Sequence, residues 1–432
     1  MKICMIGTGY VGLVSGACFA DLGNTVWCVD KDTKKIDMLN NNQIPIFEPG
    51  LEELVTKNFL SGRLMFSSRI DLAVKNCDII FICVGTPTAR KNISADLRYV
   101  YKAASDIRKY INKFKIIVTK STVPVTTGDK IEKIILKKKK RRLFEVVSNP
   151  EFLREGDAIR DFRFPDRIVI GSNSNKVTKK LETLYEPLIK KGAKFFSTTR
   201  RGAELIKYAS NAFLATKISY INEIANLCEK TGVNVEDVSI GMGLDQRIGG
   251  RFLRAGPAYG GSCFPKDTKA ITVTANLYKT DLSIIKAVIK SNAKRRKLLT
   301  NKIKEILSNK IKNKRIAFLG VTFKPNTDDM RQSSSLSMIP FLDKKGAKIS
   351  YYDPSGEKKE FSRLKSTSYC NDVSEACKNV DLVIIHTEWD EFKTIDFKKI
   401  SKGRKLKIYD MRNLYSPKKM RSLGITYYSI GR

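Results

Sequence analysis

A cysteine in a glycine-rich loop is the residue of this chain best suited to nucleophilic chemistry. Cys263 follows Gly260-Gly261-Ser262 and precedes Phe264-Pro265-Lys266-Asp267. Because proline suits the first turn of a helix, we expect Cys263 at or just before a helix N-terminus, where the helix dipole and Lys266 favour the thiolate. The glycines are expected to let a ligand approach closely. A cysteine after two glycines can also be structural, and the spacing alone leaves both interpretations open.

A second motif has the spacing of a phosphate-binding turn. Gly7, Gly9 and Gly12 form G-T-G-Y-V-G directly after an apolar run. In such a turn the first glycine allows the tight bend, the second lets a pyrophosphate approach the backbone, and the third allows close helix packing. Asp30 ends the next apolar run, where a carboxylate can accept hydrogen bonds from ribose hydroxyls and repel a 2′-phosphate. The motif therefore predicts binding of NAD rather than NADP.

Two further sets of polar residues could act with the cysteine. Lys207 and Asn211 are four residues apart, so on a helix they share one face and could together stabilise an alkoxide or hemiacetal oxyanion. Glu151 and Glu155 follow the fifth apolar run, at the edge of an α/β sheet where ligands bind. The structural alternatives are a solvated helix face for the first pair and an acidic helix N-terminus for the second.

The other reactive side chains argue against triad and metal chemistry. His386 is the only histidine and ends an apolar run, so we expect a structural role for it, and histidine acid–base or triad chemistry is nearly excluded. The nine cysteines include no C-x-x-C pair, which argues against a disulfide framework and a zinc site. We expect most of them to be reduced and buried, and no bound metal.

The elements that would hold these residues alternate between short apolar runs and helix-like stretches. The N-terminal runs are residues 2–6, 25–30, 78–84, 115–119 and 144–148. The C-terminal runs are residues 315–320, 347–353, 381–386 and 406–410. This alternation is typical of parallel sheets with crossover helices. It predicts an α/β fold with two Rossmann-like domains.

A long helix is predicted between these two domains. Residues 201–232 carry apolar side chains at helical spacing, and Gly232 is expected to cap the helix. A helix of this length can bridge domains and supply a dimer surface. The opening strand KICMIGTGY is echoed by RIAFLGVTF without the G-x-G, so the second domain either binds a nucleotide in another way or only shares the fold. We predict domains at residues 1–200, 201–300 and 301–432.

The chain is strongly basic. It has 80 Lys and Arg against 44 Asp and Glu, a formal charge of +36, which can attract nucleic acid, an anionic membrane or small anionic substrates. The densest run, residues 137–142, has no interleaved aromatic residues, so a nucleic-acid platform is not indicated. No apolar run has the length of a membrane span. We expect a cytoplasmic protein whose partners are neither nucleic acid nor membrane.

Seven motifs, taken in order, resemble the UDP-glucose/GDP-mannose dehydrogenase family. They are GTGYVG at 7–12, VGTPT at 84–88, STVP at 121–124, NPEFLREG at 149–156, AELIKYASNAFLA at 203–215, GGSCFPKD at 260–267 and FKPNTDDMRQS at 323–333. The resemblance implies an N-terminal NAD domain, a central helical dimerisation domain and a C-terminal nucleotide-sugar domain. It also implies a homodimer that oxidises UDP-glucose to UDP-glucuronate with NAD, through a thiohemiacetal and a thioester on Cys263.

The resemblance further assigns roles to individual residues. Cys263 would be the nucleophile, Lys207 and Asn211 the oxyanion stabilisers, Asp267 and Thr122 the groups that position or activate water, and Glu151 an aid to thioester hydrolysis. The expected NAD-binding residues are Gly7, Gly9, Tyr10, Val11, Gly12, Asp30, Lys35, Thr86, Pro87, Ser121, Thr122, Glu155, Lys266 and Arg331. The expected substrate-binding residues are Glu151, Phe152, Leu153, Arg154, Lys207, Asn211, Arg247, Phe252, Arg254, Tyr259, Gly260, Phe323 and Lys324. Arg247 is the one expected to reach the substrate of the partner subunit. Met411 stands where the family often has glycine, which leaves the role of Arg412 open.

Three alternatives remain from the sequence alone. The first is the same reaction on GDP-mannose or a UDP-N-acetylhexosamine. The second is a single-hydride hydroxyacid dehydrogenase, which can also use a Lys/Asn helix after a Rossmann domain but would not need Cys263 or the C-terminal domain. The third, from the charge, is a nucleic-acid-binding protein, which a salt-dependent DNA shift without NAD turnover would support.

Overall fold

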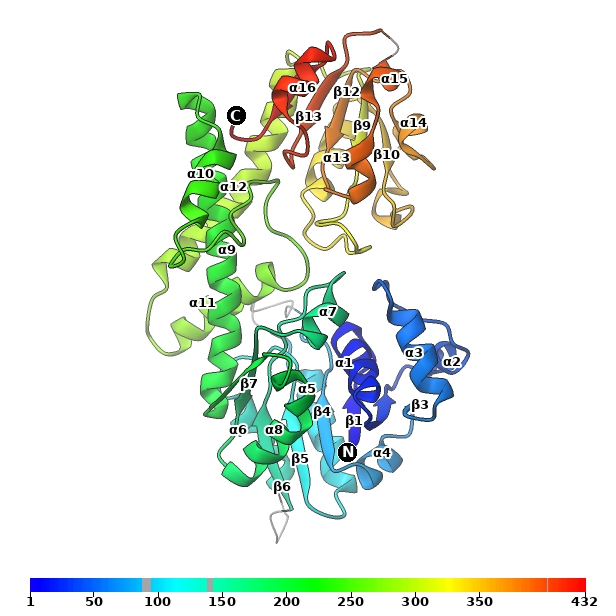
Figure 1. Ribbon diagram of the computed structural model, residues 1–432, viewed down its shortest axis with the longest axis vertical. Coiled ribbons are helices and arrows are strands. Elements are labelled where there is room, and N and C mark those ends of the chain that lie inside the picture. The colour runs from blue at the N-terminus through cyan, green and yellow to red at the C-terminus, as the bar shows by residue number, and fades with distance from the viewer. Residues whose placement is uncertain (88–94, 138–142, 402) are drawn as a thin grey trace. The chain divides into compact units, whose positions relative to one another are not determined.

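The computed structural model describes residues 1–87, 95–137, 143–401 and 403–432. Contacts divide the chain into two compact units, one of Met1–Ser210 with Lys269–Lys279 and one of Asn211–Thr268 with Thr280–Arg432. Each unit contains one sheet flanked by helices (Figure 1). The predicted fold class, with two Rossmann-like sheets and a long helix, is confirmed. The division into three domains at residues 200 and 300 stays a prediction.

The sheet of the first unit has the strand order β3-β2-β1-β4-β5-β6-β7-β8. Its strands are β1 (Lys2–Ile6), β2 (Thr25–Val29), β3 (Leu64–Ser67), β4 (Ile79–Ile82), β5 (Lys115–Thr119), β6 (Phe144–Ser148), β7 (Arg167–Gly171) and β8 (Lys194–Thr198). All neighbours are parallel except β6 and β7, which share one antiparallel pair, Ser148 with Gly171. The five apolar runs predicted as strands are β1, β2, β4, β5 and β6.

Helices cover both faces of this sheet. They are α1 (Tyr10–Asp21), α2 (Thr33–Asn40), α3 (Leu51–Leu60), α4 (Ile70–Asn76), α5 (Arg98–Tyr110), α6 (Thr127–Leu136), α7 (Ala158–Arg163) and α8 (Asn175–Ile189). Ile3 and Met5 of β1 join a core with α1, α3, α7 and α8, whereas Cys4 and Ile6 join a core with α4, α5 and α6. Because strand side chains alternate between faces, a strand buried on both sides is mostly apolar, and Lys115 of β5 and Glu145 of β6 are buried charged exceptions. Polar groups are therefore concentrated in the loops that follow the strands.

The second unit contains a parallel sheet in the order β11-β10-β9-β12-β13-β14. Its strands are β9 (Arg315–Leu319), β10 (Lys348–Tyr352), β11 (Thr367–Tyr369), β12 (Leu382–Ile385), β13 (Lys407–Asp410) and β14 (Thr426–Ser429). Its flanking helices are α13 (Ser335–Lys344), α14 (Val373–Ala376), α15 (Phe397–Ser401) and α16 (Pro417–Ser422), with 3-10 turns at Lys359–Phe361 and Asp390–Thr394. Ile316 and Phe318 of β9 pack with α9 (Arg200–Thr231), α12 (Ser283–Ile306) and α13, and Ala317 and Leu319 face the opposite core.

Four helices complete the chain: α9 (Arg200–Thr231), α10 (Val235–Gly243), α11 (Phe264–Leu277) and α12 (Ser283–Ile306). The 32 residues of α9 match the predicted long helix to within one residue at each end. Gly232 follows it with φ +73°, the left-handed conformation that commonly ends a helix. In the part of the chain that the structure describes, no helix is both long and apolar enough to cross a membrane.

Candidate active site

Cys263 lies immediately before α11, as predicted, and Pro265 occupies the first turn of that helix. It differs from the other eight cysteines, which are all buried, in being partly exposed. Burial raises the pKa of Cys18, Cys77 and Cys83 to about 12, which keeps them as unreactive thiols. Among the nine, Cys263 therefore combines access to solvent with a position beside a helix N-terminus, which favours the thiolate.

Gly260 and Gly261 pack against the segment that contains Phe323. A Cβ atom on Gly260 would lie 2.7 Å from the carbonyl oxygen of Gln332, and one on Gly261 would lie 2.7 Å from the Phe323 ring. Gly261 also has φ +77° and donates its N–H to the Arg331 carbonyl at 2.8 Å. Protein atoms therefore fill the side-chain positions of both glycines, and the expectation that a ligand approaches this loop stays a prediction. The glycines join the cysteine loop to residues 323–332.

Asn211 and Asp267 form a buried pair in the second unit. Asn211 Nδ2 on α9 donates to Asp267 Oδ2 at 2.6 Å, and Asp267 is 0% exposed. Lys266 Nζ lies 2.5 Å from the other carboxylate oxygen. The amide expected to stabilise an oxyanion is thus oriented by the carboxylate expected to handle water.

Lys207 and Glu151 form a second buried pair, in the first unit. Lys207 Nζ lies 3.3 Å from Glu151 Oε1, and both side chains are buried. Glu151 Oε2 accepts the N–H of Leu153 at 2.6 Å. The charged groups of Lys207 and Arg167 lie over the Phe152 ring, 5.1 Å and 4.0 Å from its centroid. Lys207 and Asn211 are one turn apart on the continuous helix α9. Each of the two donors is therefore held by its own carboxylate.

The turn after β1 has the geometry that a dinucleotide needs. Gly7 has φ +103°, and a Cβ on Gly12 would lie 1.8 Å from the Gly7 carbonyl oxygen, so α1 packs on the turn only because residue 12 is glycine. A Cβ on Gly9 would meet no atom within 4 Å, which leaves open space next to the backbone where a pyrophosphate approaches. The residues present fit a dinucleotide, with Val11 in the first turn of α1.

Asp30 is held in its ionised form beside this turn. Its Oδ2 accepts the N–H and hydroxyl of Thr8 at 2.8 and 3.0 Å, and its Oδ1 accepts the N–H of Asp32 at 3.1 Å. Burial alone would raise the pKa of Asp30, but these hydrogen bonds and the charge of Lys35 outweigh it and leave the pKa below its usual value. A charged carboxylate at this point can accept hydrogen bonds from hydroxyl groups and repels other negative charges.

The loops after β4 and β5 are held together by side-chain hydrogen bonds to the backbone. Thr86 Oγ1 donates to the Thr122 carbonyl at 3.0 Å, and Ser121 Oγ donates to the Val84 carbonyl at 2.7 Å. The Pro87 carbonyl accepts the N–H of Asp96 at 2.7 Å. Thr88, the last residue of the VGTPT motif, lies outside the described residues.

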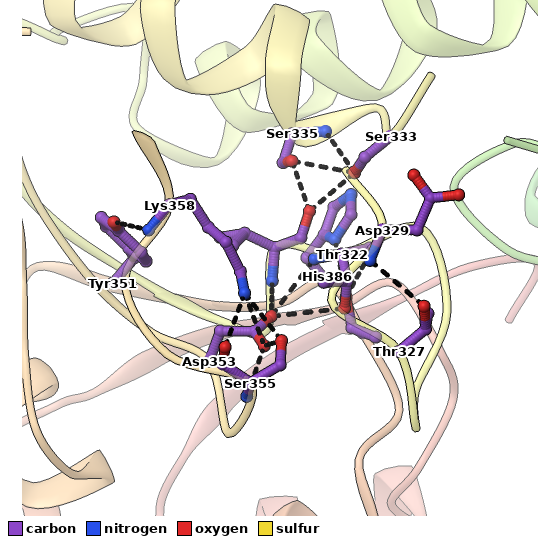
Figure 2. Close-up of polar contacts among 12 residues, drawn as sticks. Thr322, Thr327, Asp329, Ser333, Ser335, Tyr351, Asp353, Ser355, Lys358 and His386 are labelled. Carbon is purple, nitrogen blue, oxygen red and sulfur yellow. Dashed lines mark hydrogen bonds and ion pairs between the residues drawn. The ribbon is translucent and has the colours of Figure 1, made fainter. Parts of the chain in front are cut away.

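In the second unit, the turn after β9 corresponds to the turn after β1 in the first unit, and side chains of the second unit hold it in place (Figure 2). Asp353, which follows β10 as Asp30 follows β2, accepts the N–H groups of Val321 and Thr322 at 2.7 and 3.2 Å. The hydroxyls of Ser333 and Ser335 both donate to the Val321 carbonyl, at 2.7 and 2.6 Å. The segment from 321 to 335, which contains Phe323 and Lys324, is thereby pinned at both ends.

Comparison with known proteins decides the family. Profiles of the UDP-glucose/GDP-mannose dehydrogenase family match the chain with the NAD-binding domain at residues 1–189, the central domain at 201–294 and the UDP-binding domain at 317–417. The chain belongs to the UDP-glucose/GDP-mannose dehydrogenase family. It is 48% identical over 435 residues to the UDP-glucose 6-dehydrogenase of Rhizobium meliloti (strain 1021), with 100% of both chains covered.

Two solved structures of the same architecture are similar to this dehydrogenase. A UDP-glucose dehydrogenase from Pyrobaculum islandicum superposes with a TM-score of 0.90 at 36% identity, covering 99% of this chain and 96% of the other. A UDP-D-ManNAc dehydrogenase from Pyrococcus horikoshii superposes with a TM-score of 0.87 at 25% identity, covering 100% and 99%. The protein is therefore an NAD-dependent oxidoreductase of this family.

The remaining residues expected to bind the cofactor or the substrate differ in how exposed they are. Arg154, Arg247 and Arg331 are more than half exposed and pair with carboxylates close in sequence, Asp161, Asp245 and Asp329 respectively. Arg254 is exposed and Tyr259 is buried, whereas Glu155 is partly exposed; Lys324 Nζ lies 5.6 Å from the Phe323 ring centroid.

Arg412, whose role the sequence left open, positions the Phe323 segment of this dehydrogenase. Its guanidinium donates to the carbonyls of Phe323 and His386 at 2.9 and 2.8 Å and pairs with Glu388 at 2.8 Å. Met411 is buried in the core.

His386 is buried between Ser334 and Thr387. Burial, helped by the charge of Arg412, lowers the pKa of His386 to about 3, so the imidazole is neutral and structural, as expected.

Sequence reasoning missed the residues that hold the loop 251–260. Asn222 Oδ1 accepts the Gly256 N–H at 2.8 Å, Arg295 Nε donates to the Gly256 carbonyl at 3.1 Å, and Asn292 bonds both backbone groups of Tyr259. The loop is strained, with φ +67° at Phe252 and +146° at Ala258, and such strain persists only when surrounding contacts enforce it. The available signal was three polar residues on the buried faces of α9 and α12.

Proposed function

We propose that this enzyme oxidises UDP-glucose to UDP-glucuronate in two successive oxidations at one carbon, with Cys263 holding the intermediate. The observation that carries the proposal is the contrast between the partly exposed Cys263 at the start of α11 and the eight buried cysteines. The sugar is chosen because the most similar relative reported above is named for UDP-glucose, whereas the nearer rival, a UDP-D-ManNAc dehydrogenase, is only 25% identical. GDP-mannose and UDP-N-acetylhexosamines are the alternatives.

The cofactor site is proposed at the Gly7–Gly12 turn, with Asp30 on the adenosine ribose. Lys35, Thr86, Pro87, Ser121 and Thr122 stand around the carboxyl ends of β2, β4 and β5, which is where a dinucleotide lies in such a fold. When bound, NAD supplies the hydride acceptor for both oxidations. The protein itself must hold the sugar carbon, its oxygen and the attacking groups in place.

The primary alcohol first loses a proton and a hydride and becomes an aldehyde. Lys207 and Asn211 donate hydrogen bonds to the developing oxyanion, and because each is already held by a carboxylate, their orientation costs little when substrate binds. The Cys263 thiolate then forms a C–S bond to the aldehyde carbon, and the oxygen takes up a proton. This thiohemiacetal keeps the aldehyde from escaping and again has a C–H hydride to give.

Loss of the second hydride and of the hydroxyl proton gives a thioester. Water adds to its carbonyl, the C–S bond breaks with sulfur leaving as thiolate, and the product is the carboxylate. Asp267 and Thr122 are proposed to position this water, with Glu151 assisting. Asp267, fully buried and bonded to Asn211 and Lys266, has the fixed orientation that such a role requires.

NADH release with a panel of nucleotide sugars tests this proposal. We expect two NADH per UDP-glucose consumed, and the same stoichiometry with a different preferred sugar would reassign the substrate. Cys263→Ala should abolish acid formation while NADH binding persists, and Cys263→Ser should accumulate a slow ester adduct visible by intact-protein mass spectrometry. The matched control is Cys370→Ala, a buried thiol elsewhere in the second unit, which should keep activity. Wild-type turnover in Cys263→Ala would remove the cysteine from the mechanism.

We also propose that the enzyme acts as a dimer built largely on α9. Phe213, Tyr220 and Leu227, seven residues apart, are 63%, 48% and 59% exposed along one side of the helix. Large apolar side chains spaced in this way are typical of a helix that packs against a partner. Arg247 is proposed to reach the substrate of the second subunit, which its exposed position supports.

A further inference from the structure

Glu48 is a buried carboxylate in the segment between α2 and α3, outside every motif that the sequence analysis selected. It is 7% exposed. Its Oε2 accepts the N–H of Gly156 at 2.6 Å and the hydroxyl of Tyr10, and its Oε1 accepts the N–H of Ala158 at 2.7 Å. Donors from two distant parts of the chain thus converge on one carboxylate.

The first of these parts is the cofactor turn. Tyr10 is the first residue of α1 and directly follows Gly9, and its hydroxyl oxygen also lies 2.9 Å from the Gly156 nitrogen. Burial, followed by the hydrogen bond to Glu48 and its negative charge, raises the pKa of Tyr10 far above its ordinary value. The phenol therefore stays protonated and remains a donor to Glu48.

The second part is the segment that follows Glu151. Gly156 and Ala158 are buried, and their N–H groups end the 149–156 motif and begin α7. Hydrogen bonds to an ionised acceptor are stronger than neutral ones, and burial removes the water that would compete with them. The Glu48 carboxylate therefore links Tyr10, directly after Gly9, to the N–H groups of Gly156 and Ala158.

We propose that Glu48 is a positioning residue that couples NAD binding at the Gly7–Gly12 turn to the ordering of residues 149–158, and through them to binding of the sugar nucleotide. The second half rests on the proposed function. Because coupling between two sites is reciprocal, each ligand tightens the other by the same factor. The enzyme would then organise its Glu151 segment only when the hydride acceptor is in place.

Hydrogen exchange with NADH as the probe tests the first half without any turnover. In the wild type, NADH should slow exchange in peptides covering 7–16 and 150–160. In Glu48→Gln, whose amide can accept only one of the two N–H groups, NADH should still protect 7–16 but no longer 150–160. Glu52→Gln, an exposed carboxylate four residues away, should behave as wild type. NADH protection of 150–160 that is absent from wild type, or unchanged in Glu48→Gln, overturns the proposal.

Calorimetry with UDP tests the second half. NADH should tighten UDP binding at least fivefold in the wild type and less than twofold in Glu48→Gln. Tyr10→Phe, which keeps the ring but removes the donor, should lose most of the coupling and serves if Glu48→Gln does not fold. Uncoupled UDP binding in wild type overturns this half. A wild type that shows the coupling but does not oxidise UDP-glucose would refute the proposed function and leave the role of Glu48 intact.

Discussion

Asp30 and Asp353 stand at the same point of two similar sheets, yet only one of them has capacity left for a ligand. Asp353 is 0% exposed and is surrounded by the N–H groups of Val321, Thr322 and Ser355, with Lys358 Nζ 3.9 Å away (Figure 2). Asp30 is partly exposed and accepts from Thr8 and Asp32. In the second unit the carboxylate at this position is thus an internal brace, which fits a domain that shares the fold without the G-x-G turn.

Replacing Asp30 with Ala should narrow the preference for NAD over NADP. Hydrogen bonds to a charged group contribute about 1.5–3 kcal/mol, so kcat/KM for NAD should fall roughly 10- to 100-fold. The value for NADP should fall less or rise, because the like charge facing its 2′-phosphate is gone. Steady-state kinetics with both cofactors measures this, with the exposed Asp37→Ala as the control. Equal efficiency of the two cofactors in the wild type would contradict the assignment of Asp30.

At the residue scale, the sequence revealed the chemical groups but not their pairing. The position of Cys263 at a helix start could be predicted from Pro265. The expected role of Asp30 could be predicted from its distance to Gly12. The ion pair of Lys207 with Glu151 joins residues far apart in the chain, so no local pattern could reveal it. The sequence did not reveal Glu48 for the same reason, because the groups that donate to it, at Tyr10 and Gly156, belong to other parts of the chain.

At the element scale, predictability followed burial. Central strands such as β4, with all four residues buried, are continuous apolar runs, and α9 has nearly thirty residues without an interior break. Five strands were missed. The strands β3, β8, β11 and β14 lie at sheet edges, where a strand needs only one buried face or none, and their sequences are mixed. The exception is β7, an interior strand with four buried residues that was missed although its sequence is largely apolar. Most loop conformations could not be predicted, because they depend on side chains such as Asn292 and Arg412 supplied by other elements. The turn that begins at Gly7 and the helix cap at Gly232 are exceptions, because glycine itself marks them in the sequence.

The brace at the end of β10 should matter for nucleotide binding by the second unit. The N–H groups of Val321 and Thr322 share Oδ2 of Asp353, and that of Ser355 uses Oδ1. Asp353→Asn replaces one of these two acceptors with an NH2 group and leaves Lys358 without its carboxylate, which should destabilise the fold by about 3 kcal/mol. The loosened 321–335 segment should weaken UDP binding about tenfold, and NADH binding should not change. Urea unfolding and calorimetry with the two ligands measure these effects, with exposed Asp390→Asn as the control. An equal loss of both affinities would mean a global rather than a local effect.

At the scale of the whole molecule, the formal charge of +36 works against association of two copies. Like-charged protomers repel each other. At moderate ionic strength the Debye length is about 8–10 Å, so salt largely screens the repulsion between charges farther apart than that. A dimer through α9 must therefore be held by apolar burial that exceeds the repulsion. Its dissociation constant should fall as salt rises, the opposite of an interface held by ion pairs.

Sedimentation velocity tests the dimer and the face that forms it. Wild type should sediment at twice the mass of the 48.8 kDa chain, more completely at higher salt. Tyr220→Lys, which places a charge in the centre of the Phe213–Leu227 row, should give a folded monomer with greatly reduced turnover if the active unit is the dimer. Leu60→Lys is the matched control, because Leu60 is 79% exposed on α3 and should tolerate the charge.

In the dimer, Arg247→Ala should raise KM for UDP-glucose more than KM for NAD, since the proposed contact of Arg247 is with the substrate of the neighbouring subunit. A fully active wild-type monomer at assay concentration would rule out the α9 dimer and, with it, the role of Arg247.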